Sequence, residues 1–257
     1  MEHRIVVTSS KGGVGKSTTA AMTAFALAER GKKVLLIDLD LGARCLDMFF
    51  GIENETVCDF GTAYADISSA SRSVRRLNTD DAGSIMFCAS SVSLTPEKAD
   101  RDRLIATIDA LAEEAGADTV ICDTSGLLIP EKLAKWADLG LVCTTQMPAA
   151  VTSAGTTAGR LREAGLDGLR LVITAFQYYE AHHSMRAGLL RMIDTAGIQA
   201  IGVVPQDLEM FLLQEEGKLP GRSSDARRAY ANIAARLCGE ERRLFDGIRG
   251  MNGKSVL

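Results

Sequence analysis

Two hydrophobic patterns alternate along the chain. Short apolar runs bounded by polar residues or glycine are typical of buried β-strands, whereas apolar residues that recur every three or four positions are typical of helices. The first pattern predicts strands at residues 4–8, 33–37, 84–88, 119–122, 139–144, 169–174 and 200–204. The second predicts helices at residues 16–30, 97–114, 149–164, 184–195 and 224–238.

This order of strands and helices predicts an α/β fold with a mostly parallel, twisted sheet flanked by helices on both faces. We expect a single domain over residues 1–239 and a short tail over residues 240–257. Residues 66–83 are polar and rich in turn-forming residues, so they are predicted to be a surface connection. In such sheets the ligand binds at the carboxyl ends of the strands.

Composition adds little that is unusual. Of the 257 residues 46% are hydrophobic and 24% are charged, and the net charge of −4 argues against a nucleic-acid partner. The six cysteines include no C-x-x-C pair, no apolar run is long enough to span a bilayer, and the first strand begins almost at Met1. We therefore expect a cytoplasmic protein with reduced cysteines.

The most informative motif follows the first predicted strand. Residues 10–18 read S-K-G-G-V-G-K-S-T, which fits the phosphate-binding pattern G-x-x-x-x-G-K-[ST] except that Ser10 replaces the first glycine. Glycines allow backbone N–H groups to surround phosphate oxygens, and the following helix start favours an anion. Lys16 is expected to reach the β- and γ-phosphates, and Ser17 to bind Mg²⁺. The motif predicts a P-loop ATPase whose phosphate contacts come from Lys11, Gly12, Gly13, Val14, Gly15, Lys16, Ser17 and Thr18.

Two acidic segments follow other predicted strands. Asp38 and Asp40 are two residues apart after the second strand, so their carboxylates point to the same side of an extended segment. Asp123 follows an apolar strand, as a Walker B aspartate does. We expect Ser17, Asp38 and Asp123 to support Mg²⁺ and Asp40 to position the attacking water. Gly126 is expected to offer its N–H to the γ-phosphate and to move when that phosphate leaves.

The second lysine of the loop, Lys11, makes the chain similar to the deviant Walker A ATPases, the group that includes MinD, ParA, Mrp and the nitrogenase iron protein. The resemblance is strongest to the MinD type, as in I-D-L-D-L-G-A-R-C-L-D at residues 37–47 and G-V-V-P-Q-D at residues 202–207. The departures are Cys45, Cys58, the shorter D-T-S-G segment at residues 123–126, and Gln177.

This resemblance implies an ATP-driven homodimer in which Lys11 reaches the partner's phosphates and assists hydrolysis. It assigns Lys11, Lys16, Asp40 and Asp123 to catalysis. It also implies adenine recognition by the segment after the strand at residues 169–174 and by the late proline loop. The corresponding residues are Gln177, Pro205, Gln206 and Asp207.

Proteins of the MinD type bind membranes through a C-terminal amphipathic helix. If the tail were helical, one face would carry Leu244, Phe245, Ile248 and Met251. From residue 242 onward the tail contains four basic residues and one acidic residue, a net charge of 4 − 1 = +3. Gly247 and Gly250 disfavour that helix. Two interpretations stay open: peripheral binding to an anionic membrane, and packing of Leu244 and Phe245 on the domain itself.

The leading hypothesis is a MinD-like, membrane-associated switch in division-site placement, with a MinC-like inhibitor and a MinE-like activator as partners. Alternatives are a ParA-like partition ATPase, a flagellar or pilus placement ATPase, and an iron–sulfur carrier of the Mrp type. The last would place cluster cysteines at a dimer axis, and Cys122 instead lies within a predicted strand.

Overall fold

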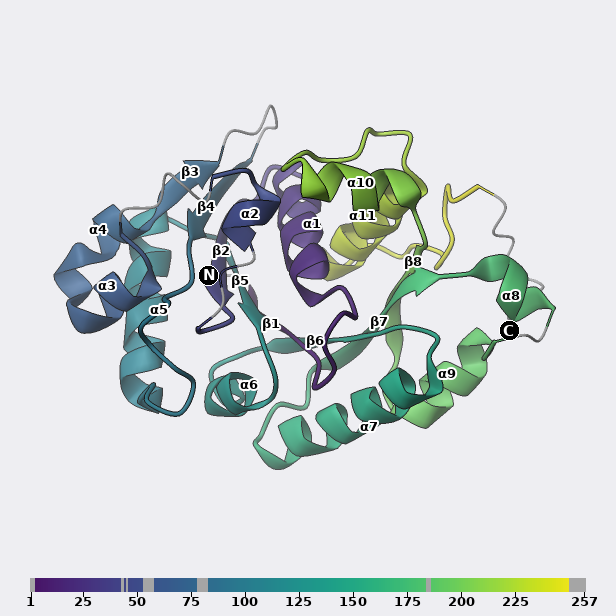
Figure 1. Cartoon of the computed structure of the whole chain (residues 1–257), viewed down its shortest axis with the longest axis horizontal. Coiled ribbons are helices and arrows are strands. Elements are labelled where there is room, and N and C mark those ends of the chain that lie inside the picture. Colours follow the sequence, from purple (N-terminus) through teal and green to yellow (C-terminus); the bar gives the residue numbers. More distant parts are fainter. Residues whose placement is uncertain are drawn as a thin grey trace.

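One eight-stranded sheet runs through the protein, with the order β3-β4-β2-β5-β1-β6-β7-β8 (Figure 1). A computed structural model describes residues 3–42, 44, 46–52, 58–77, 83–183 and 186–249. All neighbouring strands are parallel except the short edge strand β3, which is antiparallel to β4. The strands are β1 (His3–Thr8), β2 (Lys33–Leu39), β3 (Arg75–Leu77), β4 (Ser84–Cys88), β5 (Thr119–Thr124), β6 (Leu139–Thr144), β7 (Leu169–Phe176) and β8 (Ala200–Pro205).

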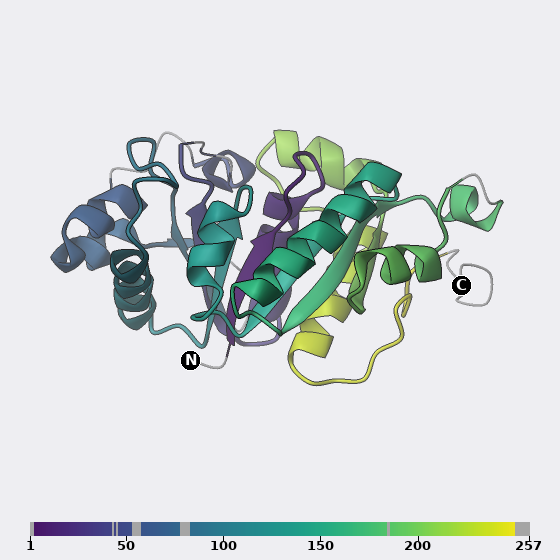
Figure 2. The same ribbon diagram turned by 90° about the horizontal axis from the view of Figure 1, so that it is seen from below.

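Helices cover both faces of this sheet (Figures 1 and 2). On one face α1 packs against α11, and on the other α5, α6, α7 and α9 follow one another across the strands. The longer helices are α1 (Lys16–Ala28), α5 (Arg101–Ala115), α7 (Pro148–Glu163), α9 (Leu189–Ala196), α10 (Leu208–Glu215) and α11 (Asp225–Leu237). The shorter ones are α2 (Leu46–Phe49), α3 (Phe60–Ala65), η1 (Ile67–Ser69), α4 (Ala70–Ser73), α6 (Leu128–Leu133) and α8 (Tyr178–His182).

The alternation of side chains along β2 shows why both faces need a helical layer. Val34 and Leu36 belong to the apolar cluster that contains α1, while Leu35 and Ile37 belong to the cluster that contains α5. All four are essentially inaccessible to water. A strand that is apolar on both sides is typical of a parallel sheet in a three-layer fold, so the predicted fold class is confirmed.

The seven predicted strands are present, and four of them continue past the predicted carboxyl end. β2 extends to Leu39, β5 to Thr124, β7 to Phe176 and β8 to Pro205. The sequence pattern ended β2 and β5 before their first aspartate, but the two strands stay paired through Asp38 and Asp123. These two aspartates therefore lie inside strands and not in the loops after them.

Residues 66–83 are more structured than predicted, since their described part contains η1, α4 and the edge strand β3. Two arginines in a three-residue strand give no period-2 apolar pattern, which explains why the sequence predicted a loop. The predicted helix at residues 184–195 begins later, at Leu189.

The described part of the tail forms turns and not the amphipathic helix that one of the two interpretations requires. Gly247 has a φ of 69°, which a right-handed helix does not accommodate. Ile248 is 6% exposed, and Leu244 and Phe245 pack against the core. The Asn232 amide donates to the Asp246 carbonyl at 2.7 Å. Met251 lies outside the described residues. Within the described ranges no helix is long and apolar enough to traverse a lipid bilayer.

Candidate nucleotide-binding site

The loop at residues 9–15 joins β1 to α1 and depends on two glycines. Gly13 and Gly15 have φ values of 70° and 75°, in the left-handed region that side chains disfavour. Gly15 immediately precedes α1, and no side chain caps that helix end. The first N–H groups of a helix have no acceptor within the helix itself, and the helix dipole adds a positive potential at this end. The loop has the geometry of an anion-binding site.

Threonine hydroxyls fix this loop to the neighbouring strands. Thr174 at the end of β7 donates to the Val14 carbonyl at 2.8 Å, and Thr8 donates to the Gly126 carbonyl at 3.1 Å. Ser9 and Gly126 also form an isolated antiparallel bridge. Because these contacts come from β1, β5 and β7, the phosphate loop and the segment after Asp123 are held as one unit.

The two loop lysines differ in environment. The Lys16 ammonium donates to the Lys11 carbonyl at 3.3 Å, so it lies over the loop. The Lys11 side chain is exposed, and its ammonium has no ion-pair or hydrogen-bond partner among the described residues. Lys16 is therefore positioned for the phosphates of its own site, whereas Lys11 is directed toward solvent.

Asp38 is fully buried and organises the segment that follows β2. Its two carboxylate oxygens accept the N–H groups of Asp40 at 3.0 Å and of Leu46 at 3.2 Å. The Asp40 carbonyl in turn accepts the Ser90 hydroxyl at 2.9 Å. Asp38 thus fixes the backbone that carries Asp40, an effect that the sequence pattern alone did not predict.

Asp123 lies beside Asp38 in the sheet and is the least satisfied polar group of the site. It is 1% exposed, and both carboxylate oxygens are buried without a hydrogen-bond partner. Burial raises the pKa of Asp123 to about 8, and the Asp38 carboxylate adds to the rise. The Ser17 hydroxyl and the Lys16 ammonium partly offset it, although the Ser17 contact falls short of hydrogen-bond geometry.

This arrangement suits a divalent cation. A buried carboxylate without partners next to a second carboxylate is costly alone, and hard oxygen donors are the ligands that Mg²⁺ prefers. The Ser17 hydroxyl and the Asp123 carboxylate would face such an ion together. The buried, unpartnered carboxylate of Asp123 is therefore consistent with the predicted metal support.

A cavity of about 440 Å³ opens beside the loop, on the side of β8. Pro205, Gln206 and Asp207 line it together with Gly13, Val14 and Gly15, so the structure brings the late proline loop to the phosphate loop. Its apolar walls include Met210, Phe211 and Tyr230. This is the space that an aromatic base attached to the phosphates would occupy.

Gln177 does not line this cavity. Its backbone N–H donates to the Gln146 side chain at 2.7 Å, and its amide donates to the Gln206 side chain. Asp207 lines the cavity, but its carboxylate accepts the Ser224 hydroxyl at 2.7 Å and the Met210 N–H at 3.2 Å. Gln206 is an amide side chain among the residues that line the cavity, and the predicted base contacts stay predictions.

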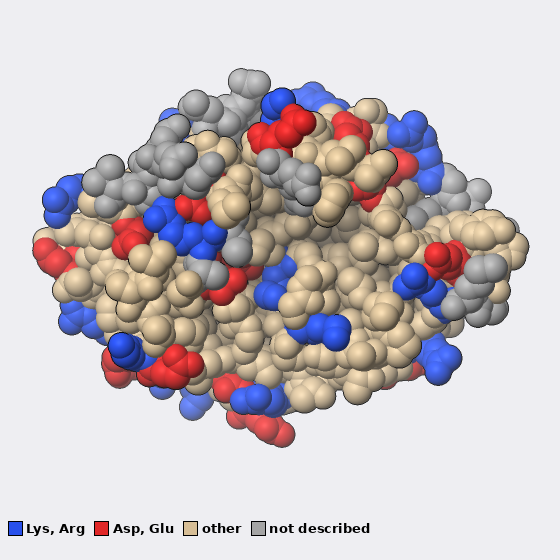
Figure 3. Space-filling view, viewed as in Figure 1, with Lys and Arg blue, Asp and Glu red and all other residues tan. Residues whose placement is uncertain are grey.

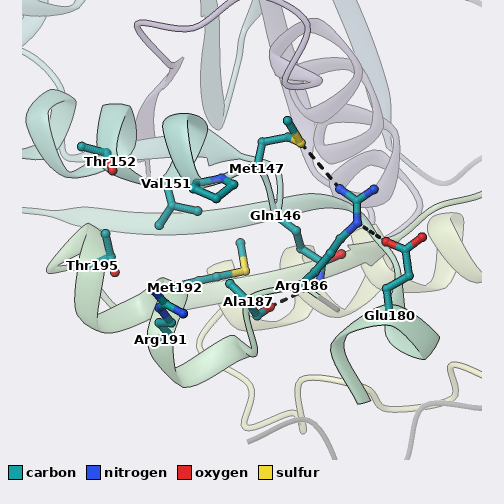
Figure 4. Close-up of a pocket in the computed structure, with 11 residues that line it drawn as sticks. Gln146, Met147, Val151, Thr152, Glu180, Arg186, Ala187, Arg191, Met192 and Thr195 are labelled. Atoms are coloured by element: carbon teal, nitrogen blue, oxygen red, sulfur yellow. Dashed lines mark hydrogen bonds and ion pairs between the residues drawn. The ribbon is translucent and has the colours of Figure 1, made fainter. Parts of the chain in front are cut away.

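A second, larger hollow of about 710 Å³ lies between the start of α7 and α9 (Figure 4). The Gln146 amide crosses it to the Ala187 carbonyl at 3.3 Å. Arg186 forms an ion pair with Glu180 and contacts the Met147 sulfur at 3.6 Å. This hollow is separate from the phosphate loop, and none of the predicted site residues lines it.

Charge is mixed on the face that carries the phosphate loop. Figure 3 shows positive and negative side chains interspersed, with positive groups beside the central hollow where Figure 1 places the loop. The described residues on this face form no broad positive surface of the kind that nucleic acid needs. Cys88, Cys122 and Cys143 are buried within strands, away from any surface where two chains could share a cluster.

The parallel sheet, the glycine loop before α1 and the buried aspartate at the end of β5 define a P-loop nucleotide-binding protein. Residues 5–220 match the family model "CobQ/CobB/MinD/ParA nucleotide binding domain", and the chain belongs to this family.

Several similar proteins are MinD proteins. The septum site-determining protein MinD of Escherichia coli K12 is 27% identical over 255 residues, covering 94% of this chain and 93% of that protein. MinD in the MinC:MinD cell division complex of Aquifex aeolicus has a TM-score of 0.83 and 24% identity, covering 94% and 98% of the two chains. MinD of Pyrococcus horikoshii complexed with Mg-ADP has a TM-score of 0.76 and 21% identity, covering 92% and 96%.

The buried carboxylate of Asp123 predicts a pH-dependent cost to folding. Its folded pKa of about 8 exceeds the usual value near 4, so the folded protein binds the extra proton and loses stability as pH rises from about 4 to about 8. Asp123→Asn removes that charge. In urea unfolding without Mg²⁺ or nucleotide, we expect the variant to be more stable than the wild type by about 1–3 kcal/mol at pH 8 and nearly equal to it at pH 5.

Asp194→Asn is the matched control, because Asp194 is an exposed aspartate on α9. It should leave the pH dependence of unfolding unchanged. An Asp123→Asn protein that is less stable than the wild type at pH 8 would contradict the assignment of Asp123 as an uncompensated buried charge.

Proposed function

We propose that this chain is a MinD-like, Mg²⁺-dependent ATP hydrolase that dimerises when ATP binds and acts as a spatial switch in division-site placement. The observation that carries the proposal is the exposed ammonium of Lys11, unpaired within the described chain, beside a complete phosphate loop. A lysine whose side chain points away from its own loop is placed to contact a phosphate that is bound by a second copy of the chain. Positive charge supplied in trans stabilises the negative transition state of phosphoryl transfer.

Within each chain the remaining roles follow from position. Lys16 and the N–H groups of residues 12–18 hold the phosphates, and Asp40 orients the attacking water. Ser17 and Asp123 would hold the metal, and Asp38 fixes the backbone that carries Asp40. Mg²⁺, when bound, neutralises charge on the β- and γ-phosphates. Gly126 bridges to Ser9, so loss of the γ-phosphate would be felt directly by the segment that follows Asp123.

Exposed apolar side chains near the site support a partner on this face. Leu208, Phe211 and Leu212 share one side of α10 and are 70%, 59% and 51% exposed. Phe211 also lines the cavity beside the phosphate loop. A second copy bound over the nucleotide would cover this face.

The relatives suggest which proteins this switch works with. One of the similar structures is MinD in a complex with MinC. We propose a MinC-like inhibitor as a partner of the ATP-bound dimer and a MinE-like protein as its activator. Both would recognise the dimer and not the single chain.

The in-trans role of Lys11 predicts dimer-dependent turnover. For the wild type, hydrolysis per chain should rise steeply with protein concentration. Lys11→Ala should lower the maximal rate at least about 100-fold, the size expected for loss of a charged transition-state contact. Because the Lys11 side chain is exposed and its ammonium makes no hydrogen bond or ion pair with the described residues, ADP affinity of the single chain should change less than about threefold. Normal turnover in Lys11→Ala would contradict the proposal.

We also propose peripheral attachment to the inner face of the cell membrane through the tail. Since Leu244, Phe245 and Ile248 pack against the core here, membrane binding requires their release. Two tails in one dimer would bind together more strongly than one. The wild type should therefore sediment with anionic liposomes in ATP but not in ADP, and Phe245→Asp should abolish sedimentation.

Leu190→Ser provides a control for that experiment, because Leu190 is an apolar residue on α9 that is half exposed and far from the tail in the chain. It should sediment like the wild type. Equal sedimentation in ATP and ADP, or none with either, would contradict the proposed attachment.

A further inference from the structure

Ser10, the residue that breaks the usual loop pattern, contacts two hydroxyls of α7. Its Oγ lies 2.5 Å from the Ser153 Oγ and 2.9 Å from the Thr157 Oγ1. The Ser10 N–H also donates to the Thr157 Oγ1 at 3.3 Å. Ser153 and Thr157 are four residues apart, so they occupy the same side of α7 in successive turns.

One arrangement of protons satisfies this cluster completely. Thr157 donates to the Ser153 carbonyl at 2.8 Å, which leaves its two lone pairs for the Ser10 N–H and the Ser10 hydroxyl. Ser153 can then donate to Ser10. Each hydroxyl uses its single proton once, and such chains of hydrogen bonds reinforce one another. Thr157 is fully buried, so its partners cannot be replaced by bulk water without cost.

The cluster fixes the backbone from which Lys11 projects. The Lys11 N–H donates to the Ser9 Oγ at 3.2 Å, and its carbonyl accepts the Lys16 ammonium at 3.3 Å. The residue before it is held by Ser153 and Thr157. The polar backbone groups on both sides of the Lys11 Cα thus have partners, while the side chain itself is exposed.

We infer that Ser153 and Thr157 are positioning residues for Lys11: through Ser10 they hold the loop so that the Lys11 side chain points toward a second copy of this chain. The inference rests on the proposed function, because it concerns the lysine that acts in trans. A glycine at position 10 would carry no hydroxyl for this contact. Ser10 therefore links the phosphate loop to α7 where the usual pattern has no side chain.

A positioning residue and a residue that only supports the fold affect different measured quantities when they are replaced. Loss of one neutral hydrogen bond corresponds to about a three- to tenfold change in a rate or equilibrium constant. If the hydroxyls act through Lys11, removing one of them lowers the hydrolysis rate of the dimer and does not change the nucleotide affinity of the single chain. The same removal has no effect on the rate when Lys11 is already absent, because the effects of two residues that act through one another are not additive.

The test compares Ser153→Ala, Thr157→Val and Thr157→Ser, each with Lys11 present and in a Lys11→Ala background. Single-turnover ATP hydrolysis at high protein concentration, ADP affinity and thermal unfolding are measured for every variant. Thr156→Ala is the matched control, since this exposed hydroxyl on the same helix donates only to the Thr152 carbonyl.

We expect Ser153→Ala and Thr157→Val to slow hydrolysis about three- to tenfold with ADP affinity unchanged. Thr157→Ser, which retains the hydroxyl, and the control Thr156→Ala should both hydrolyse ATP at the wild-type rate. In the Lys11→Ala background the same substitutions should have no further effect. If Lys11→Ala is impaired but the α7 variants hydrolyse at the wild-type rate, or slow both backgrounds equally, the inference is overturned and the proposed function stands. If Lys11→Ala hydrolyses normally, both fail.

Discussion

The site depends on parallel pairing of β1 with β5, and of β5 with β2. This pairing brings the carboxyl ends of three strands to one edge, where the phosphate loop, Asp123 and Asp38 meet. The loop at residues 9–15 could adopt many conformations alone, and the hydroxyls of Thr8 and Thr174 select one by tying it to the ends of β5 and β7. The anion site is thus formed by tertiary contacts before a ligand arrives, which lowers the cost of ordering it on binding.

The same pairing creates the main electrostatic cost in the site. Register places Asp38 and Asp123 side by side in the buried sheet, and only Asp38 has hydrogen-bond donors within reach. An unpartnered carboxylate at this position lowers the stability of the empty protein, but it creates a site that binds positive charge strongly. The orphaned oxygens of Asp123 are therefore a better sign of function than its position in a motif.

Much of the fold could be predicted from the sequence, because each parallel strand is a short apolar run followed by a helical pattern. The phosphate-binding role of the loop at residues 10–18 could also be predicted, since this order of glycines and lysine is specific to phosphate-binding loops. What could not be predicted depends on contacts between distant segments. Ser153 and Thr157 look like ordinary small polar residues of α7 until the fold brings them to Ser10. The hydrogen bond from the Gln177 amide to the Gln206 side chain likewise joins segments that are 29 residues apart in the chain.

The tail shows a different limit. Periodicity placed Leu244, Phe245 and Ile248 on one face of a helix, but Gly247 turns the backbone and the core offers these side chains an apolar surface. An apolar stripe in a sequence indicates that its side chains are buried, but it does not indicate whether they are buried against protein or in lipid. The switch hypothesis requires that ATP binding move these side chains from the protein core to the membrane.

The central claim is that one chain holds only half of a working site. Mixing two inactive variants tests it directly: Lys11→Ala keeps Asp40 but lacks the lysine, and Asp40→Ala keeps the lysine but lacks the residue that orients water. A mixed dimer would contain one complete site, so equal amounts should recover about a quarter of wild-type turnover. Turnover in the mixture no greater than the sum of the separate variants would contradict the account.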